Sequence, residues 1–319
     1  MALVVVTEWI DEAALERLRE RHQVVYDVGL HRDRPRLFDA LAEAEALVVR
    51  NQTRVDTQLL DAAPRLRVIG RVGVGLETID VAAANARDVV VSWAPGTNAT
   101  SVAEYVIGGV IALARRFGPA TSHVAEGGWQ RQAFMGREVA GATLGIVGLG
   151  DIGARVARRA QALGMRLLGS DPVVHESSAV VQEFGVELVT FEALLERSDA
   201  LTLHVPLTAT TRDLIDAQAL GRMRRDAYLI NTARGELVDE TALAAALRSG
   251  HLGGAALDVR RSEPPAAPDP LAGCPNLILT PHVAGVTAEA NARASAHAVD
   301  EVLRVLRGER ARTPAPAPS

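Results

Sequence analysis

The sequence lacks several residue types and segments, and each absence excludes a class of protein. Its 319 residues include no lysine, so all 34 cationic side chains are arginine, which we interpret as a bias of genome composition without functional meaning. The single cysteine, Cys274, excludes a disulfide within the chain and is typical of a reducing compartment. Excess positive charge is also missing, and a net charge of −5 gives no reason to expect nucleic acid or an anionic membrane as a partner.

Long hydrophobic runs are absent as well. The opening residues, MALVVVTEWIDE, carry no basic segment, and their apolar run is interrupted at Thr7 and Glu8, so no signal peptide is expected. No stretch approaches the roughly 20 apolar residues of a membrane-spanning helix. We therefore expect a cytoplasmic protein whose length allows two domains, each with a sizeable core.

What the sequence does contain is a repeated alternation of short apolar runs with helical patterns. One series of runs lies at 3–7, 24–28, 46–50, 67–72 and 89–94, and a second lies at 143–148, 166–171, 186–190, 200–205, 227–232, 253–259 and 277–282. This alternation predicts parallel sheets covered by helices on both faces. We expect an α/β protein with two doubly wound parallel-sheet domains.

Helices are expected before and after the second series. The segment 97–118, TNATSVAEYVIGGVIALARRFG, predicts a long buried helix that begins at a capping box of Ser101 and Glu104. A final helix is expected over about 287–308, and its position indicates that the chain returns to the first domain. The closing residues, TPAPAPS, are expected to form a disordered tail.

The stretch LGIVGLGDIG, residues 144–153, predicts a loop that binds a dinucleotide. Gly148, Gly150 and Gly153 hold the three fingerprint positions between an expected strand and an expected helix. The first two glycines permit a tight turn and a close approach of the backbone, and the helix N-terminus offers free N–H groups to a pyrophosphate. The alternative, a purely structural turn, is the less favoured interpretation.

The carboxylate at the end of the next expected strand favours NAD over NADP. Asp171 ends RLLGSD, about 20 residues after the glycines, the offset of a carboxylate that binds the adenosine ribose hydroxyls. The residues that follow, Pro172, Val173 and Val174, include no arginine for a 2′-phosphate.

Residues suited to acid–base chemistry follow later strands of the second series. Arg234 lies in NTARGELVD, Asp258 and Glu263 lie in ALDVRRSEPP, and His282 lies in LTPHVAG. Ligands of open parallel sheets bind beyond the carboxyl ends of the strands, so these side chains are expected to converge. An arginine can bind a carboxylate, and a histidine beside a carboxylate is a general base. With a cofactor that takes a hydride, they suit oxidation of a 2-hydroxy acid or the reverse reaction. His204 is interpreted instead as a buried strand residue.

From VVRNQT to TPHVAG the sequence resembles the D-isomer-specific 2-hydroxyacid dehydrogenases, most of all the short members of phosphoglycerate-dehydrogenase type. The resemblance implies a homodimer in which a Rossmann NAD-binding domain, 99–285, is inserted into a flavodoxin-like substrate-binding domain, 1–98 plus 286–319. It also implies a catalytic trio of Arg234, Glu263 and His282. Formate dehydrogenases carry glutamine at the carboxylate position, so Glu263 argues against that branch.

The resemblance extends to the binding residues and implies no metal site. Contacts with NAD are implied for Gly148, Gly150, Asp151, Ile152, Gly153, Asp171, Val205, Pro206, Thr211, Thr232, Ala233, Asp258, His282 and Gly285. Contacts with the substrate are implied for Arg50, Asn51, Arg71, Gly73, Val74, Gly75, Asn98, Arg131, Arg234 and His282.

Two positions depart from the family pattern. Asp151 stands where a basic residue is usual, so we expect its side chain to point to solvent or to act as a charge at the helix start. Arg50 and Asn51 stand where phosphoglycerate dehydrogenases typically have Arg-Ser. Together with Arg71 and with Arg131, which in the resembled family comes from the neighbouring subunit, Arg50 predicts a second anionic group on the substrate.

Several functions remain open at this point. The first is oxidation of 3-phosphoglycerate or a close analogue. Some sulfolactate dehydrogenases resemble this family and carry a similar Arg-Asn pair, which makes 3-sulfolactate an alternative. A hydroxypyruvate or glyoxylate reductase would need less positive charge in the distal pocket. From a different class, the family includes NAD-binding corepressors, which use the same fold for protein contacts.

Overall fold

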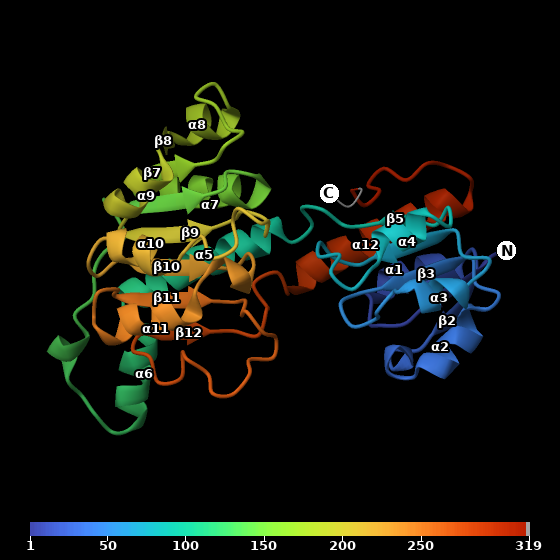
Figure 1. Cartoon of the computed structure of the whole chain (residues 1–319), viewed down its shortest axis with the longest axis horizontal. Coiled ribbons are helices and arrows are strands. Elements are labelled where there is room, and N and C mark those ends of the chain that lie inside the picture. The colour runs from blue at the N-terminus through green and yellow to red at the C-terminus, as the bar shows by residue number, and fades with distance from the viewer. Residues whose placement is uncertain (317–319) are drawn as a thin grey trace. The chain divides into compact units, whose positions relative to one another are not determined.

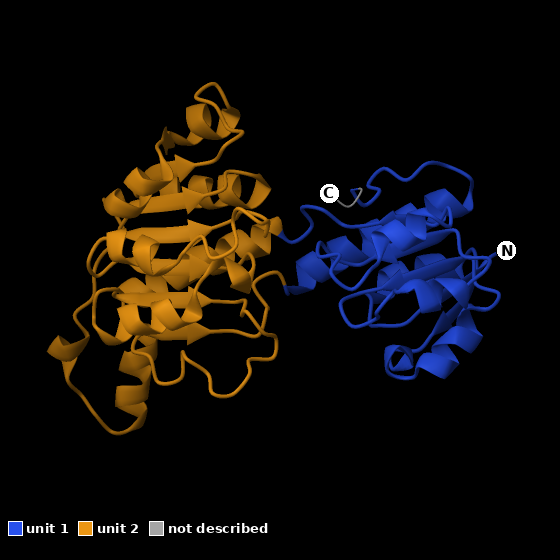
Figure 2. Ribbon diagram, in the orientation of Figure 1, with its two compact units in different colours: residues 1–98, 286–319 blue, residues 99–285 orange. Residues whose placement is uncertain are grey.

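The computed structural model describes residues 1–316 and divides into two compact units. Unit 1 consists of residues 1–98 together with the chain from 286 onward, and unit 2 consists of residues 99–285 (Figure 2). Unit 2 is therefore inserted into unit 1, while the ligand that each unit binds stays a prediction. Within residues 1–316, no helix combines the length and the apolar character needed to cross a membrane.

Unit 1 contains a five-stranded parallel sheet in the order β2-β1-β3-β4-β5 (Figure 1). Its strands are β1 (Leu3–Val6), β2 (Gln23–Tyr26), β3 (Ala46–Val49), β4 (Val68–Arg71) and β5 (Val90–Ser92). Every residue of β3 and β4 is buried, as expected for central strands that are covered on both faces.

The helices of unit 1 cover both faces of this sheet. They are α1 (Glu12–Arg19), α2 (Arg34–Leu41), α3 (Thr57–Asp61), α4 (Val81–Asn85) and α12 (Ala288–Leu306), with a 3₁₀ turn η1 (Leu30–Arg32). Alternate strand residues point to opposite faces, so Val4 packs with α1 and α12 while Val5 packs with α2, α3 and α4. Figure 1 shows α12, from the far end of the chain, against this sheet. Gly70 makes room for it, because a Cβ there would lie 2.7 Å from Val302.

The expected disordered tail is wrong for the residues that the structure describes. Pro314 forms an antiparallel bridge with Ser92, and the N–H of Ala315 donates to the carbonyl of Val91 at 2.7 Å. The hydroxyl of Thr313 also donates to the carbonyl of Trp93. The segment therefore pairs with the exposed edge of β5, because that edge strand has unpaired backbone groups. Residues 317–319 lie outside the described residues.

Unit 2 contains a seven-stranded parallel sheet in the order β12-β11-β10-β9-β6-β7-β8. Its strands are β6 (Thr143–Val147), β7 (Arg166–Ser170), β8 (Glu187–Leu188), β9 (Ala200–Leu203), β10 (Tyr228–Asn231), β11 (Gly254–Leu257) and β12 (Leu277–Leu279). The two sheets confirm the prediction of an α/β protein with two doubly wound parallel-sheet domains.

The helices of unit 2 again form two layers. They are α5 (Ala99–Ala114), α6 (Phe117–Ala125), α7 (Asp151–Ala162), α8 (Ala179–Phe184), α9 (Phe191–Arg197), α10 (Ala217–Arg222) and α11 (Glu240–Arg248), with 3₁₀ turns η2 (Arg131–Phe134) and η3 (Gly235–Leu237). The core on one face contains side chains of α5, α7 and α8, and the core on the other contains side chains of α9, α10 and α11.

The expected start of the long helix, with Ser101 as its capping residue, is wrong. Helix α5 begins at Ala99, so Ser101 lies inside its first turn and is buried. Glu104 forms an ion pair with Arg159 of α7 at 3.2 Å instead of closing a capping box. Glu104 therefore stabilises the packing of α5 on α7 and not the start of its own helix.

Strand order reverses once in each sheet, between β1 and β3 in unit 1 and between β6 and β9 in unit 2. Neighbouring crossover helices there lie on opposite faces, which leaves a crevice beyond the carboxyl ends of the strands. Arg50 directly follows β3, and Gly148 directly follows β6. The fold therefore places two groups of predicted site residues at the points where open α/β sheets bind ligands.

Candidate active site

The glycine loop after β6 has the geometry that close contact with a ligand requires. Gly148 has a φ of +90°, and a Cβ there would lie 2.8 Å from the carbonyl oxygen of His204. At Gly153 a Cβ would lie 2.1 Å from the carbonyl oxygen of Gly148, so the first turn of α7 packs directly on the loop. A Cβ at Gly150, by contrast, would meet nothing within 4 Å among the described residues. The loop is tight on its inner side and open at its middle glycine, where helix α7 begins.

Asp151, the first residue of α7, is neutralised within its own helix. Its Oδ1 accepts a hydrogen bond from Nε of Arg155 at 2.9 Å, and the Asp151 side chain is half-exposed. Arg155 is held in turn by the hydroxyl of Thr100 at 3.1 Å. A helix-start charge of this kind agrees with the expectation for the side chain, whereas a contact of Asp151 with NAD stays a prediction.

Asp171, at the end of β7, faces the same loop. Its Oδ2 accepts the N–H of Leu149 at 2.8 Å, and its Oδ1 accepts the N–H of Val173 at 2.8 Å. Oδ1 also accepts the N–H of Val174 at 3.3 Å, and since a carboxylate can accept about four hydrogen bonds, acceptor capacity remains for about one hydroxyl group. The side chain thus fixes the glycine loop from the position predicted for ribose binding.

Two buried polar atoms near this edge have no hydrogen-bond partner among the described residues: Oγ1 of Thr232 and Nδ1 of His204. Thr232 follows β10 and His204 follows the neighbouring β9, whose last residues pair in register. Burial lowers the pKa of His204 to about 3, so its ring is neutral. Unpaired buried groups are rare in proteins, and a polar ligand at this edge would satisfy them. With the open Gly150, they fit a bound NAD.

The predicted acid–base pair is assembled in unit 2. His282 lies in the turn after β12 with a φ of +57°, and its Nδ1 lies 2.8 Å from Oε2 of Glu263. The other carboxylate oxygen of Glu263 accepts the N–H of Arg260 at 3.1 Å. Both side chains are half-exposed. The ring is therefore held through one nitrogen, and Nε2 is left as the nitrogen that can exchange a proton with a ligand.

Asp258, predicted to contact the cofactor, holds the loop that carries His282. Its buried carboxylate accepts hydrogen bonds from the Thr280 hydroxyl at 2.6 Å and from the N–H groups of Val283 and Ala284, each at 2.7 Å. The carbonyl of Asp258 also accepts the N–H of His282 at 2.8 Å. These hydrogen bonds stabilise the loop and so offset the energetic cost of the positive φ of His282.

Arg234 lies in a turn that is stabilised by Asn231, a residue that the sequence analysis did not single out. Buried Asn231 donates from Nδ2 to the carbonyl of Arg234 at 2.8 Å and accepts the N–H of Ala233 at 3.0 Å. Arg234 itself donates from Nη1 to the carbonyl of Ala233 at 2.7 Å. The sequence contained a signal for this role, because asparagine often bonds to backbone groups two or three residues away.

In unit 1 the predicted substrate residues surround a carboxylate that sequence analysis missed. Glu8 follows β1, is only 4% exposed, and accepts the N–H groups of all four residues from Arg50 to Thr53 at 2.8–3.2 Å, together with the Thr53 hydroxyl at 2.8 Å. Burial opposes ionisation of Glu8, but the bonds from Thr53, Arg50 and Gln52 outweigh it, so the pKa of Glu8 is lowered. The loop after β3 is therefore wrapped around an internal negative charge.

The guanidinium of Arg50 is held by two further residues that were not predicted. It donates from Nη2 to Oδ1 of Asn291, in the first turns of α12, at 2.9 Å and from Nη1 to the carbonyl of Trp9 at 3.3 Å. It also lies 5.3 Å from the centre of the Trp9 ring. These bonds use two of its five N–H groups. Arg50 is thereby positioned at the reversal point of strand order in unit 1.

Arg71 has a mainly internal role in the structure. It is buried and donates to the carbonyls of Val72 and Gly75, each at 2.7 Å, so it shapes the turn that contains Gly73 and Val74. Burial lowers the pKa of Arg71, and the nearby Glu8 and Glu77 oppose that effect. Its contact with substrate stays a prediction.

The remaining predicted residues lie apart from these clusters or at the joints between the units. Asn98 and Gly285 end their units at the two chain crossings, and Arg131 lies in η2 of unit 2, on an exposed segment. In unit 2, Thr211 donates to the carbonyl of Pro206 at 2.7 Å and so closes the loop after β9. No cluster of metal-ligating side chains of three or more members is found within residues 1–316.

Comparisons with known proteins agree with this arrangement. Residues 107–284 match the sequence model of a family described as D-isomer specific 2-hydroxyacid dehydrogenase, NAD binding domain. A relative named (S)-sulfolactate dehydrogenase, from Chromohalobacter salexigens, is 50% identical over 308 residues, which are 96% of this chain and 99% of the relative.

A second relative and a solved structure extend the likeness. A D-3-phosphoglycerate dehydrogenase from Methanocaldococcus jannaschii is 41% identical over 97% of this chain, but this chain spans only 58% of that protein's length. The crystal structure of the TT0316 protein from Thermus thermophilus has a TM-score of 0.90 at 35% identity, with 98% of this chain and 100% of that chain covered. The similarity thus includes both units.

Proposed function

Because this chain belongs to the family of D-isomer-specific 2-hydroxyacid dehydrogenases, which are NAD-dependent oxidoreductases, we propose that its substrate is a small 2-hydroxy or 2-oxo acid with a second anionic group. The observation that carries the proposed reaction type is the contact between His282 and Glu263 at the sheet edge that also holds the glycine loop, and the position of Arg50 supports the second anionic group. A histidine held by a carboxylate suits proton transfer, and the loop suits a dinucleotide.

Each residue of the trio has a distinct role in the proposed reaction. When bound, NAD supplies the hydride acceptor or donor. In oxidation, Nε2 of His282 takes the proton of the substrate hydroxyl, and in reduction the protonated ring returns it. Glu263 stabilises the positive charge on the ring through Nδ1. Arg234 binds the substrate carboxylate through charge-assisted hydrogen bonds.

The distal group is proposed to be a sulfonate, with 3-sulfolactate as the first candidate substrate. Glu8 places a negative charge beside Arg50 and Arg71, which reduces the extra attraction that a doubly charged phosphate would have over a singly charged sulfonate. Asn51 offers an amide donor to an oxygen that can only accept. The relative named sulfolactate dehydrogenase also matches over nearly its whole length. The second candidate is 3-phosphoglycerate, which the arginines would also bind.

An assay of NADH formation with a panel of hydroxy acids tests this function. We expect 3-sulfolactate and 3-phosphoglycerate to be oxidised with higher kcat/KM than D-lactate or glycerate. If D-lactate were oxidised with equal efficiency, the substrate would not need a distal anionic group. A dehydrogenase of simple hydroxy acids or a hydroxypyruvate reductase would then be favoured. Binding of NAD without turnover of any acid would favour a corepressor-like function instead.

The segment around α6 and η2 supports a homodimer. Trp129 is 79% exposed and Met135 is 76% exposed, and Phe117 and Val124 are also exposed beside them in the sequence. Exposed apolar side chains gathered on one segment are typical of a protein interface. Sedimentation should show a dimer that Trp129→Ser with Met135→Ser weakens. A wild-type monomer at micromolar concentration would exclude this interface.

The single cysteine supports a cytoplasmic location.

A further inference from the structure

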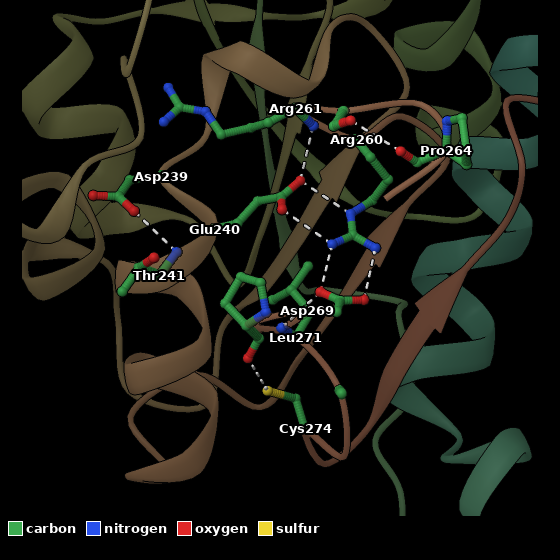
Figure 3. A network of polar contacts seen from close by, with 12 residues as sticks. Asp239, Glu240, Thr241, Arg260, Arg261, Pro264, Asp269, Leu271 and Cys274 are labelled. Atoms are coloured by element: carbon green, nitrogen blue, oxygen red, sulfur yellow. Dashed lines mark hydrogen bonds and ion pairs between the residues drawn. The ribbon is translucent and has the colours of Figure 1, made fainter. Parts of the chain in front are cut away.

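A largely buried ionic network connects the start of helix α11 with the segment that follows strand β11 (Figure 3). Arg260 makes two hydrogen bonds of 3.0 Å to the carboxylate of Glu240 and two more, of 2.7 and 3.2 Å, to the carboxylate of Asp269. Arg260 is 9% exposed and Glu240 is 8% exposed. We call these three residues the Arg260 network. The hydrogen bonds that Arg260 donates to Glu240, and then those that it donates to Asp269, raise the pKa of Arg260 despite its burial.

The network ties together the two chain segments that carry the proposed catalytic side chains. Glu240 is the first residue of α11, and the segment before it begins at Arg234. Arg260 precedes Glu263 by three residues, and its N–H donates to Glu263 itself at 3.1 Å. Glu240 also accepts the N–H of Arg261 at 2.9 Å, so its carboxylate binds the backbone of the Glu263 loop as well as the guanidinium.

Close backbone packing reinforces the connection. A Cβ on Gly235 would lie 2.0 Å from the carbonyl carbon of Arg260, so the turn after Arg234 rests directly on the backbone of the Glu263 loop. A displacement of Arg260 therefore moves the turn that follows Arg234 and the loop that precedes Glu263 together. The neighbouring Arg261 forms an ion pair with Asp213.

We propose that the Arg260 network is a positioning element that sets the orientation of the Glu263 carboxylate toward His282. The inference rests on the proposed function, in which that pair moves the proton. The network residues do not touch the reacting atoms; they act through the N–H of Arg260 and the loop that it fixes. Misplacement of a catalytic group by about 1 Å can cost on the order of a hundredfold in rate, so a rigid support has a large effect on turnover.

Stability alone is a poor explanation for three charges at this place. Buried ion pairs are often no more stabilising than apolar residues of similar volume, because removing the charges from water costs about as much as their attraction returns. Apolar residues cannot fix the orientation of a side chain as directional hydrogen bonds do. Two carboxylates around one planar guanidinium fix its position and its angle, and they thereby fix the backbone of Arg260 as well.

The test uses a replacement that removes all three charges and keeps the fold, Arg260→Met with Glu240→Leu and Asp269→Asn in one chain, because an asparagine oxygen still accepts the N–H of Leu271. We expect the melting temperature to stay close to that of the wild type. We expect kcat to fall about tenfold or more, with KM for NAD within about twofold. Glu240→Gln, which keeps the shape and removes the charge, should cause a smaller loss of kcat in the same direction. A stable variant with wild-type kcat would overturn the proposal.

A double-mutant cycle identifies the residue through which the network acts. In a chain that already carries Glu263→Gln, the network replacement should cost about twofold or less, because the carboxylate that it orients is gone. A full additional loss in that background would overturn the proposal. If Glu263→Gln alone leaves turnover unchanged, the proposed function fails at this site, which is a different result.

A matched control separates the network from ion pairs in general. Arg197 and Glu187 form a pair with two bonds of 2.8 Å in the same unit, on the surface and between α9 and β8. Arg197→Met with Glu187→Leu should change kcat by less than about twofold, since surface pairs contribute little. A loss in this control equal to that of the network replacement would show a general effect on unit 2 and would overturn the assignment.

Discussion

The carboxyl edges of the two sheets are built on different principles. In unit 2 the edge depends mainly on backbone geometry, with a glycine at a φ of +90°, a histidine at +57° and two buried polar atoms, in Thr232 and His204, that have no hydrogen-bond partner among residues 1–316. In unit 1 the edge is shaped by charge, because Glu8 gathers the N–H groups of a whole loop and Arg50 is held between Asn291 and Trp9. We therefore expect the first edge to suit a ligand of fixed structure and the second to select a ligand by its charge.

The largest effect is expected where proton transfer depends on one side chain. His282→Ala should reduce kcat by about 10²–10⁴, the usual range for losing general acid–base catalysis, with little change in NAD affinity. Steady-state rates with 3-sulfolactate and fluorescence titration with NADH measure the two quantities. Wild-type turnover in this variant would remove His282 from the mechanism.

The second largest effect is expected at Arg50, on the charge-based edge of unit 1, and it should raise KM only for substrates with a distal anionic group. Losing one charge-assisted contact costs roughly 1.5–3 kcal/mol. Arg50→Ala should therefore raise KM about ten- to a hundredfold for an acid with a distal anion, while KM for D-lactate or glycerate stays nearly constant. Higher salt should narrow the difference in the wild type. A uniform rise for all acids would mean that Arg50 supports the fold and not the distal group.

The backbone-based edge of unit 2 makes a prediction about cofactor choice. The carboxylate of Asp171 should repel a 2′-phosphate, so kcat/KM should favour NAD over NADP by at least about tenfold. Asp171→Asn keeps an acceptor for the N–H of Leu149 but removes the charge, and should reduce the ratio. Equal use of both cofactors by the wild type would contradict this role of the strand end.

The same contrast explains what the sequence could predict. Gly148, Asp171 and the turn at His282 follow strands at fixed offsets, and such backbone requirements limit the residue type strongly. Both sheets and the proximity of His282 to Glu263 were therefore predictable, while the catalytic role of this pair stays a prediction. Glu8 and Asn291 were not, because any surface residue can be a glutamate or an asparagine until a distant segment packs against it. Glu8 meets a loop about forty residues later, and Asn291 meets Arg50 only because α12 returns to unit 1.

Those long-range contacts make the stability of unit 1 sensitive to acid. The pKa of Glu8 is lower in the folded chain, since its hydrogen bonds outweigh burial. Its contribution is therefore fully present above the unfolded pKa of about 4.3 and is lost as pH falls through the folded value. Unfolding followed by tryptophan fluorescence, with Trp9 and Trp93 in unit 1, should show this loss.

A substitution isolates the contribution of Glu8. Glu8→Gln should lower the free energy of unfolding by about 1–3 kcal/mol at neutral pH, because an amide oxygen replaces two acceptor oxygens for five donors. It should also flatten the dependence on pH. Glu12→Gln, on the surface of α1, serves as the control and should change neither quantity. An unchanged pH dependence in Glu8→Gln would assign the acid sensitivity to other carboxylates.

The smallest effect is expected at Asn291, and it tests how the charged edge is assembled. The amide holds Arg50 through one hydrogen bond of 2.9 Å, worth about 0.5–1.5 kcal/mol. Asn291→Ala should raise KM for 3-sulfolactate about two- to tenfold and leave kcat unchanged, because we propose proton transfer at His282, in unit 2. Glu289→Ala, in the same turn of α12, is the matched control. In a chain that already carries Arg50→Ala, removing Asn291 should have no further effect on KM. An equal rise in that background would mean that Asn291 reaches the substrate by itself, and the charged edge would then consist of two independent groups.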